Sequence, residues 1–197
     1  MKQVERSSQT RAALVAAARR LWSRRGYEAV GTPAIAAAAG VTRGAMYHQF
    51  ADKAALFAAV LEAVEADVTD RLGRQVLASG AQDPPAALRA AAGAWLDACE
   101  EPEVRQLLLV DGPRVLGWAA FRELTLRYGL GLTEQLLEAA LGDDRPVSAL
   151  AHVLIGALDE AAMYVAAAPD RDAARAEVEA VLDDLVAGLL RARTGSS

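Results

Sequence analysis

The chain has 197 residues, which suits one compact domain or a small domain joined to a larger one. It is rich in Ala, Leu and Arg and only 5% of its residues are aromatic, so intrinsic propensities predict an all-α protein. The single cysteine, Cys99, excludes an internal disulfide, and we find neither a signal peptide nor an apolar run long enough to span a bilayer, so we expect a cytoplasmic protein with no membrane partner.

Charge is distributed unevenly along the chain. The formal net charge of −5 at pH 7 by itself argues against a nucleic-acid partner. Residues 1–53, however, hold nine Lys or Arg against three acids, a net charge of +6 that leaves −11 for the remainder. This division is expected of a basic nucleic-acid-binding module joined to an acidic body, although a chance gradient would give the same numbers.

Three helices are expected within the basic segment. The first covers residues 7–25, beginning at one of two adjacent serines and ending before a glycine. The second, about two turns long, covers residues 32–40, with Thr32 as its N-cap and a proline at its first helical position. The third covers residues 42–50, with Thr42 as its N-cap. Two short helices joined by a Gly-Val-Thr turn have the size and punctuation of a helix-turn-helix, whose second helix lies in the DNA major groove.

The third helix has an inward and an outward side. Met46 and Phe50 stand four residues apart and therefore share one face, which packs against the first helix. The remaining positions point outward, and we expect these four to contact DNA: Arg43, Gly44, Tyr47 and His48. Three further residues near helix N-termini suit phosphate binding: Thr32, Thr42 and Lys53.

Each outward residue has a use at a DNA surface and an alternative. Arg43 presents two donors to a guanine edge, or contacts phosphate only. Tyr47 meets a phosphate or a thymine methyl, or packs half-buried; His48 donates to a phosphate, or is merely solvated. Gly44 lets the helix approach the duplex closely, or serves internal packing. An N-terminal arm would extend the footprint through Lys2, Arg6 and Arg11. A solvated helix face is expected for Arg19, Arg20, Arg24 and Arg25.

A longer helical body follows. A fourth helix, capped by Asp52, covers residues 53–77 and connects the basic segment to the body. Apolar-periodic segments then cover residues 85–99, 103–110, 115–141, 146–167 and 170–192. We therefore predict about nine helices, in a helix-turn-helix domain over residues 1–53 and a helical bundle domain over residues 54–197. The segment 146–167 is apolar nearly all round, so it needs burial on all sides, in a dimer or in an ordinary monomeric core.

The stretch from Thr10 to Phe57, which includes GYEAVGTPAIAAAAGVTRGAMYHQFADKAALF, resembles the DNA-binding domain of the TetR family. A Gly-Tyr end of the first helix, a Thr opening the second, the IAxxAGV turn and a Gly-x-x-Tyr third helix match in order and spacing. The resemblance implies a transcriptional repressor and assigns DNA contacts to the seven residues named above. It also implies a homodimer through the last two helices, a roughly palindromic double-stranded DNA operator and a small-molecule effector that releases the protein. Gln49 departs from the pattern, because many members have an aromatic residue or His there.

The same resemblance implies a ligand-binding body. Its candidate lining residues mix aromatic surface with occasional polar groups on apolar helices, and each suits a plain core as well. They are Trp95, Cys99, Trp118, Phe121, Arg122, Tyr128, His152 and Met163. Asp111, Arg114 and Asp159 interrupt the apolar surface and either hold a ligand or form ion pairs.

An enzyme is not expected. The sequence has no Glu-x-x-His pair for a di-iron centre, no GxxxxGK phosphate loop and no GxSxG nucleophile motif, so neither a metal nor a cofactor is predicted. The alternative to a repressor is a helix-turn-helix activator or an architectural DNA binder without a ligand, and the sequence does not distinguish between them.

Overall fold

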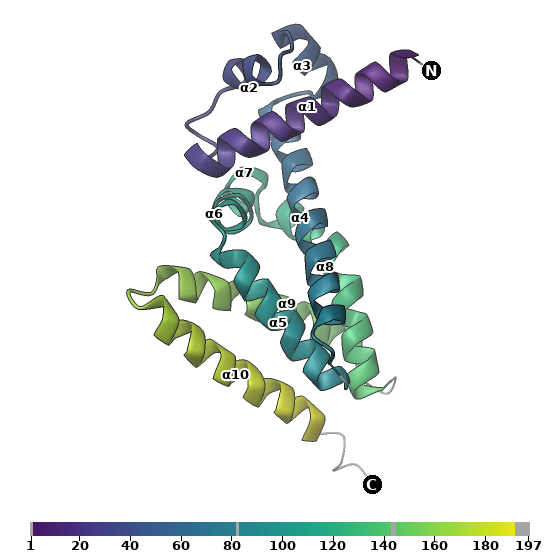
Figure 1. Ribbon diagram of the computed structural model, residues 1–197, viewed down its shortest axis with the longest axis vertical. Helices are drawn as coiled ribbons and strands as arrows, with labels where there is room; N and C mark the ends of the chain where they lie inside the picture. The colour runs from purple at the N-terminus through teal and green to yellow at the C-terminus, as the bar shows by residue number, and fades with distance from the viewer. Residues whose placement is uncertain (1, 82, 143–144, 192–197) are drawn as a thin grey trace. The chain divides into compact units, whose positions relative to one another are not determined.

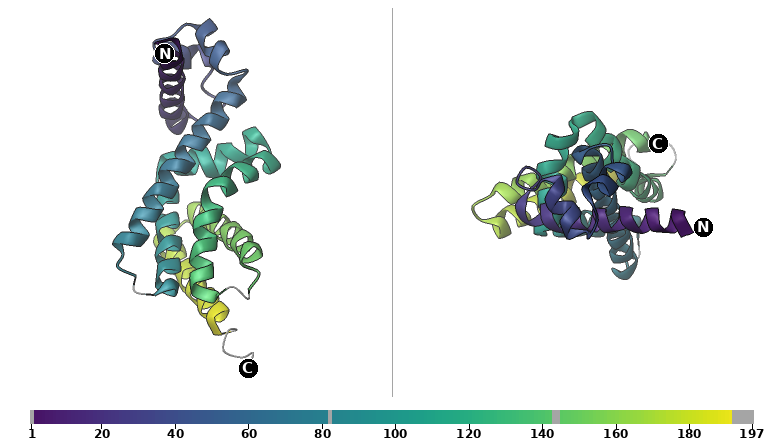
Figure 2. Two further views of the ribbon diagram at one scale, coloured as in Figure 1. Left: turned by 90° about the vertical axis from the view of Figure 1, so that its right-hand side faces the viewer. Right: turned by 90° about the horizontal axis from the view of Figure 1, so that it is seen from above.

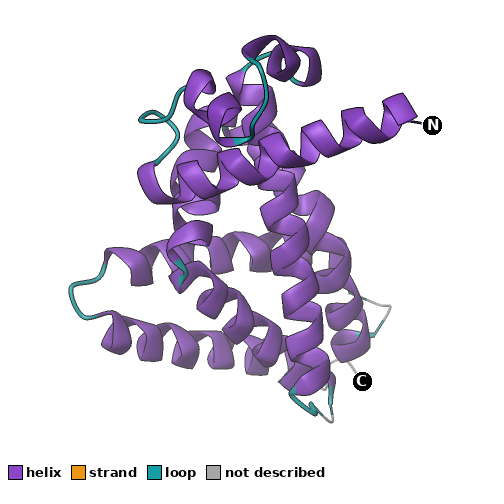
Figure 3. Ribbon diagram, turned by 45° about the horizontal axis from the view of Figure 1, so that its top comes forward, coloured by secondary structure: helices purple, strands orange, loops and turns teal. Residues whose placement is uncertain are grey.

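The chain is helical throughout the part that the structure, a computed structural model, describes: residues 2–81, 83–142 and 145–191 (Figures 1 and 3). No β-strand occurs in these ranges. The helices are α1 (Lys2–Arg25), α2 (Thr32–Ala38), α3 (Arg43–Gln49), α4 (Lys53–Ala78), α5 (Pro84–Glu100), α6 (Pro102–Val104), the π-helix η1 (Arg105–Asp111), α7 (Gly112–Leu116), α8 (Trp118–Leu141), α9 (Val147–Ala167) and α10 (Arg171–Arg191). Because α6, η1 and α7 follow one another without a break, these ranges hold nine helical segments, and the predicted all-α class and helix number are confirmed.

The helices form two compact units. The first comprises Met1–Glu65 and Glu101–Leu124, and the second comprises Ala66–Glu100 and Thr125–Ser197. Helices α4 and α8 therefore each contribute to both units. The first unit combines the predicted helix-turn-helix with a segment from the middle of the chain. The predicted boundary between a DNA-binding domain and a ligand-sensing domain at residue 53 stays a prediction.

Local signals end and begin most helices of the first unit where the sequence predicts. Gly26 and Gly40 adopt positive φ angles of 76° and 68°, the left-handed conformation that stops α1 and α2. The Thr42 side chain accepts a hydrogen bond of 3.1 Å from the Ala45 backbone N–H and so caps α3. Asp52 caps α4 in the same way.

Two of the predicted helix starts are wrong. Helix α1 begins at Lys2, before the expected start at Ser7 or Ser8, because the intervening residues are mostly good helix formers. Thr32 is not the N-cap of α2, because Gly31 takes that position and makes no side-chain cap bond. Thr32 is instead the first helical residue, and its hydroxyl lies 3.3 Å from that of Tyr47.

Later boundaries also differ from the prediction. The segment expected over residues 115–141 is divided, because Gly117 has a φ of 76° and α8 begins only at Trp118. The segment expected over residues 103–110 extends through α6, η1 and α7. The predicted end of the last helix at residue 192 lies outside the described residues.

Aromatic side chains form the centre of the first unit. Trp22 and Phe57 are fully buried, and their ring centroids lie 5.3 Å apart. Tyr27, in the loop after α1, lies 5.4 Å from Trp22 and 4.9 Å from Phe57 between ring centroids. Helix α1 packs against α2 and α3 (Figures 1 and 2). The aromatic cluster therefore joins α1, the loop that follows it and the start of α4.

Two polar tethers join this cluster to the segment after residue 100. The guanidinium of Arg19 donates to both carboxylate oxygens of Glu103, at 3.0 and 2.8 Å, so the expected solvated position of Arg19 is wrong. Buried Asp111 accepts hydrogen bonds from the Tyr27 backbone N–H at 2.9 Å and from the Gln106 amide at 3.0 Å. Asp111 thus serves as an anchor for the loop that follows α1.

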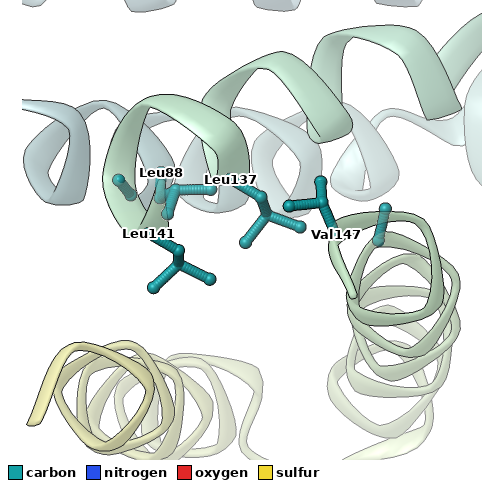
Figure 4. Close-up of a cluster of buried hydrophobic side chains, with 6 residues drawn as sticks. Leu88, Leu137, Leu141 and Val147 are labelled. Atoms are coloured by element: carbon teal, nitrogen blue, oxygen red, sulfur yellow. The ribbon is translucent and has the colours of Figure 1, made fainter. Parts of the chain in front are cut away.

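The second unit is organised by buried apolar side chains from α5, α8 and α9. Its buried cluster consists of Leu88, Leu137, Ala140, Leu141, Val147 and Ala151 (Figure 4). Arg175 of α10 is tied to α5 through Asp97 at 2.7 Å and Glu100 at 2.9 Å. Partial burial would lower the pKa of Arg175, but hydrogen bonds to Asp97 and Glu179 outweigh it and raise the pKa.

Helix α9 is long and apolar enough to cross a membrane by length and composition. The expectation that the sequence has no apolar run long enough to span a bilayer is therefore wrong for this helix. Asp159 and Glu160 interrupt the apolar residues, but the helix as a whole remains apolar. Only 17% of its apolar window is buried within the chain.

The Asp111 anchor predicts a large effect of its removal on stability. Asp111→Ala leaves the Tyr27 N–H and the Gln106 amide without their acceptor, and we expect the free energy of unfolding to fall by about 2–3 kcal/mol. Asp111→Asn keeps one acceptor oxygen and should lose less. Urea unfolding followed by circular dichroism measures both, with Glu28→Ala, an exposed acid of the same loop, as control. An Asp111→Ala protein as stable as the Glu28→Ala protein would contradict the assignment.

Candidate nucleic-acid interface

The third helix has the two sides that its sequence predicts. Met46 and Phe50 are buried, with exposed fractions of 0% and 3%, and they hold α3 against the rest of the first unit. The side chains or backbone of the four outward positions are exposed: Arg43, Gly44, Tyr47 and His48. The structure therefore brings these four residues together on one accessible surface, which we call the α3 outer face.

Tyr47 stands at the centre of the α3 outer face. Its side chain is 43% exposed, so a large part of it is accessible while the rest packs against the protein. Its hydroxyl lies 3.3 Å from the hydroxyl of Thr32, and the Arg43 guanidinium carbon lies 5.6 Å from its ring centroid. The hydrogen bond with Thr32 and the neighbouring Arg43 lower the pKa of Tyr47. Thr32, itself 9% exposed, thereby orients the tyrosine from α2.

Gly44 has open space around it. A Cβ atom built there would meet only the Thr42 hydroxyl oxygen, at 4.0 Å, which is ordinary van der Waals contact. No neighbour in the described chain therefore requires a glycine at this position, and the internal-packing interpretation has no support.

Lys53 turns toward the protein. Its ammonium donates a 2.7 Å hydrogen bond to the carbonyl of Tyr27 and lies 3.8 Å from the centroid of the Tyr27 ring. Partial burial, together with Glu28 and Asp52, raises the pKa of Tyr27. Lys53 thus links the first turn of α4 to the loop after α1, a contact that the sequence did not reveal because the two residues are 26 positions apart.

Arg11 and Gln49 form a second contact that sequence reasoning missed. Arg11 donates to the backbone carbonyl of Gln49 at 3.3 Å, and its guanidinium carbon lies 4.3 Å above the ring of Phe50. Arg11 is therefore engaged with α3, not free in an N-terminal arm as expected. Of the other expected arm residues, Arg6 is exposed and the side chain of Lys2 lies outside the description.

The eight candidate ligand residues divide between the two units. Trp118, Phe121 and Arg122 belong to the first unit, whereas the other five belong to the second: Trp95, Cys99, Tyr128, His152 and Met163. Trp118 is 67% exposed and lies 6.5 Å from Phe121 between ring centroids. Phe121 packs on Gly112, where an added Cβ would come within 2.6 Å of its ring.

Within the second unit, the candidates lie on different surfaces. His152 and Met163 are exposed on α9, and a ring nitrogen of His152 lies 2.8 Å from the Ser148 carbonyl oxygen. Trp95 and Cys99 lie one turn apart on α5, where Cys99 is buried. The indole Nε1 of Trp95 is buried without a hydrogen-bond partner among the described atoms. Residues 2–81, 83–142 and 145–191 contain no group of three metal-ligating side chains.

Comparisons with known proteins match both the N-terminal and the C-terminal part of the chain. The chain matches the family described as bacterial regulatory proteins, tetR family, over residues 14–60, and the tetracyclin repressor-like C-terminal domain over residues 85–189. The HTH-type transcriptional regulator AcrR of Shigella flexneri is 34% identical over 108 residues, which cover 55% of this chain and 50% of that protein. The chain thus matches about half the length of this curated relative.

Solved structures extend the likeness to nearly the whole chain. A TetR-family transcriptional regulator from Pectobacterium atrosepticum is 34% identical and superposes with a TM-score of 0.79, covering 94% of this chain and 96% of that one. RolR, solved with the ligand resorcinol, shares the fold at a TM-score of 0.72 and 19% identity, with 95% of each chain covered. Because both family domains match in order and a 34% identical structure covers almost all of the chain, the protein belongs to the TetR family of bacterial regulatory proteins.

Proposed function

We propose that the protein is a cytoplasmic transcriptional repressor that binds a palindromic DNA operator as a homodimer and is released by a small molecule. One observation carries the DNA-binding part: the α3 outer face is accessible and presents arginine, tyrosine and histidine side chains around an unobstructed glycine. A short helix with such a face is suited to the major groove of a duplex. The surrounding segment, residues 1–53, carries a net charge of +6, which favours phosphate neutralisation.

The proposed contacts divide into base reading and phosphate binding. Arg43 can present two donors to a guanine edge, and a ring N–H of His48 or the hydroxyl of Tyr47 can donate to phosphate oxygens. Thr42 and Lys53 lie at the starts of α3 and α4, where the helix dipoles favour an anion. Lys53 keeps two ammonium protons beyond the one donated to Tyr27.

The proposed dimer forms through α9 and α10. Large apolar side chains are exposed on these helices: Val153, Met163, Tyr164, Val181 and Leu185. Val181 and Leu185 stand four residues apart and share one helix face. An isologous contact would bury these side chains and the poorly covered α9, and would present two α3 outer faces to a two-fold symmetric operator.

The proposed effector site includes α5. The buried indole N–H of Trp95 has no acceptor among the described atoms, and a buried donor left unpaired costs free energy. A ligand with an oxygen acceptor would satisfy it, and resorcinol, the ligand of RolR, is a small molecule of that type. A ligand that prefers a conformation with misplaced recognition helices would shift the population away from DNA binding. An effector bound at Trp95 would favour a ligand-responsive regulator over an activator or architectural binder without a ligand.

Selection of bound sequences from random duplex DNA tests the proposed function. The full-length protein should enrich a motif with two inverted half-sites, because two α3 outer faces in a symmetric dimer read the same bases on opposite strands. A variant with Tyr47→Ala and Arg43→Ala is the control and should enrich nothing. Failure of the native protein to enrich any sequence at low salt would refute the proposal. A reporter gene behind the selected motif then separates repression from activation.

Replacement of Arg43 should reduce specificity at one base position of the operator. If it reads a guanine with two donors, Arg43→Ala should lower affinity for the selected motif by about 1–3 kcal/mol and make one base position of each half-site indifferent. Fluorescence anisotropy with single-base variants of the duplex measures this. Uniform weakening on every duplex would show that Arg43 contacts phosphate alone.

Replacement of Gly44 by alanine should have opposite effects on stability and on DNA binding. Gly44→Ala should stabilise α3 by up to about 1 kcal/mol, because alanine is the better helix former and the site has room for a methyl group. The same methyl group should weaken operator binding if α3 lies close to the duplex. Gly73→Ala in α4, also in open space, is the matched control and should change stability only. Unchanged operator affinity of the Gly44→Ala protein would remove the close-approach role.

The exposed face of α9 predicts a charge-sensitive dimer. Val153, 70% exposed in the chain, should become buried in the dimer, so Val153→Asp places an unpaired charge there and should weaken dimerisation by more than about tenfold. Sedimentation equilibrium measures the dimer dissociation constant. Leu77→Asp, at an apolar position 84% exposed on α4, serves as control and should leave the dimer intact. Equal effects of the two substitutions would place the interface elsewhere.

A further inference from the structure

The C-terminal end of α3 depends on contacts from other elements. The helix has seven residues and ends at Gln49, after which Phe50 is extended with φ −137° and ψ 128°. The last carbonyl groups of a helix have no intrahelical donors, so partners must come from elsewhere. Any tilt of this end displaces Tyr47 and His48, which lie in the last turn.

Helix α1 supplies those partners from one of its faces. Arg11 donates to the Gln49 carbonyl at 3.3 Å and stacks on Phe50 with its guanidinium carbon 4.3 Å from the ring centroid. One turn earlier, the hydroxyl oxygen of Ser7 accepts a 2.8 Å hydrogen bond from the Gln49 side-chain amide. Ser7 and Arg11 stand four residues apart and so reach the same end of α3 together.

We propose that Ser7 and Arg11 are positioning residues that set the orientation of the recognition helix α3, and that Gln49 is their point of attachment. Gln49 then does not contact bases, because both its carbonyl and its amide are directed to α1. The guanidinium of Arg11 holds the end of α3 with a hydrogen bond and with its ring contact. The competing role for the same cation is direct contact with a DNA phosphate.

Salt dependence and specificity separate these two roles. The proposal rests on the proposed function, so the full-length native protein is first titrated with its selected operator and with a scrambled duplex of equal length. Arg11→Ala should weaken operator binding by about three- to tenfold, the size expected for one exposed cation–π contact with its hydrogen bond. The control is Arg20→Ala, which removes an exposed charge from the same helix. The Arg11→Ala and Arg20→Ala proteins should have the same affinity for the scrambled duplex and the same slope of log affinity against log salt.

Two results would overturn the proposal. Equal losses on both duplexes, with a salt slope reduced by about one, would make Arg11 a phosphate contact. No loss beyond that of Arg20→Ala would give Arg11 no role. If the native protein binds neither duplex, the proposed function itself fails. If the native protein binds and the variants behave as phosphate contacts, only the positioning role fails.

A second set of variants keeps the test independent of folding. Ser7→Ala and Gln49→Ala remove only the neutral hydrogen bond between two side chains, and thermal unfolding by circular dichroism should be nearly unchanged. Each should weaken operator binding by about two- to fivefold, as expected for one hydrogen bond. The double variant should bind as the weaker single variant does, because both changes break one contact. Losses that multiply would show that the two residues act separately and would contradict the proposal.

Discussion

Burial of Met46 and Phe50 is the contact on which the proposed function depends. Helix α3 has seven residues, and helices of this length do not persist alone in water, so its conformation must be imposed by tertiary packing. With Met46 and Phe50 buried, the structure leaves Arg43, Gly44, Tyr47 and His48 exposed on the same short segment. The same packing therefore stabilises α3 and leaves its polar side chains accessible.

Polar contacts around this packing fix the remaining freedom of α3. Thr42 caps the start of the helix, Thr32 holds the Tyr47 hydroxyl from α2, and α1 reaches the other end through Arg11. The aromatic cluster beneath is tied in turn to η1 through the Asp111 carboxylate. A residue that lies 84 positions further along the chain is therefore part of the same compact unit as α2 and α3.

Features set by neighbouring residues were predictable from the sequence. The caps Thr42 and Asp52 and the left-handed glycines Gly26 and Gly40 act within one turn, and the apolar spacing of α3 defines its inner face directly. Features that depend on distant partners were not predictable: Arg19 looked like a solvated residue until Glu103, 84 positions away, was placed beside it. The candidate ligand residues were the least predictable, because aromatic side chains on apolar helices look alike in sequence. Some fill a core, as Phe121 does on Gly112, and others remain exposed, as Trp118 does.

Site-directed crosslinking tests most directly whether the α3 outer face lies in a DNA groove. The chain has a single cysteine, Cys99, which is buried, so a thiol-linked photocrosslinker on His48→Cys reports from the α3 outer face alone. Illumination with the selected operator should give a protein–DNA adduct from position 48 and none from a Leu77→Cys control on α4. Equal adduct yields from both positions, or adducts from position 77 alone, would contradict the account.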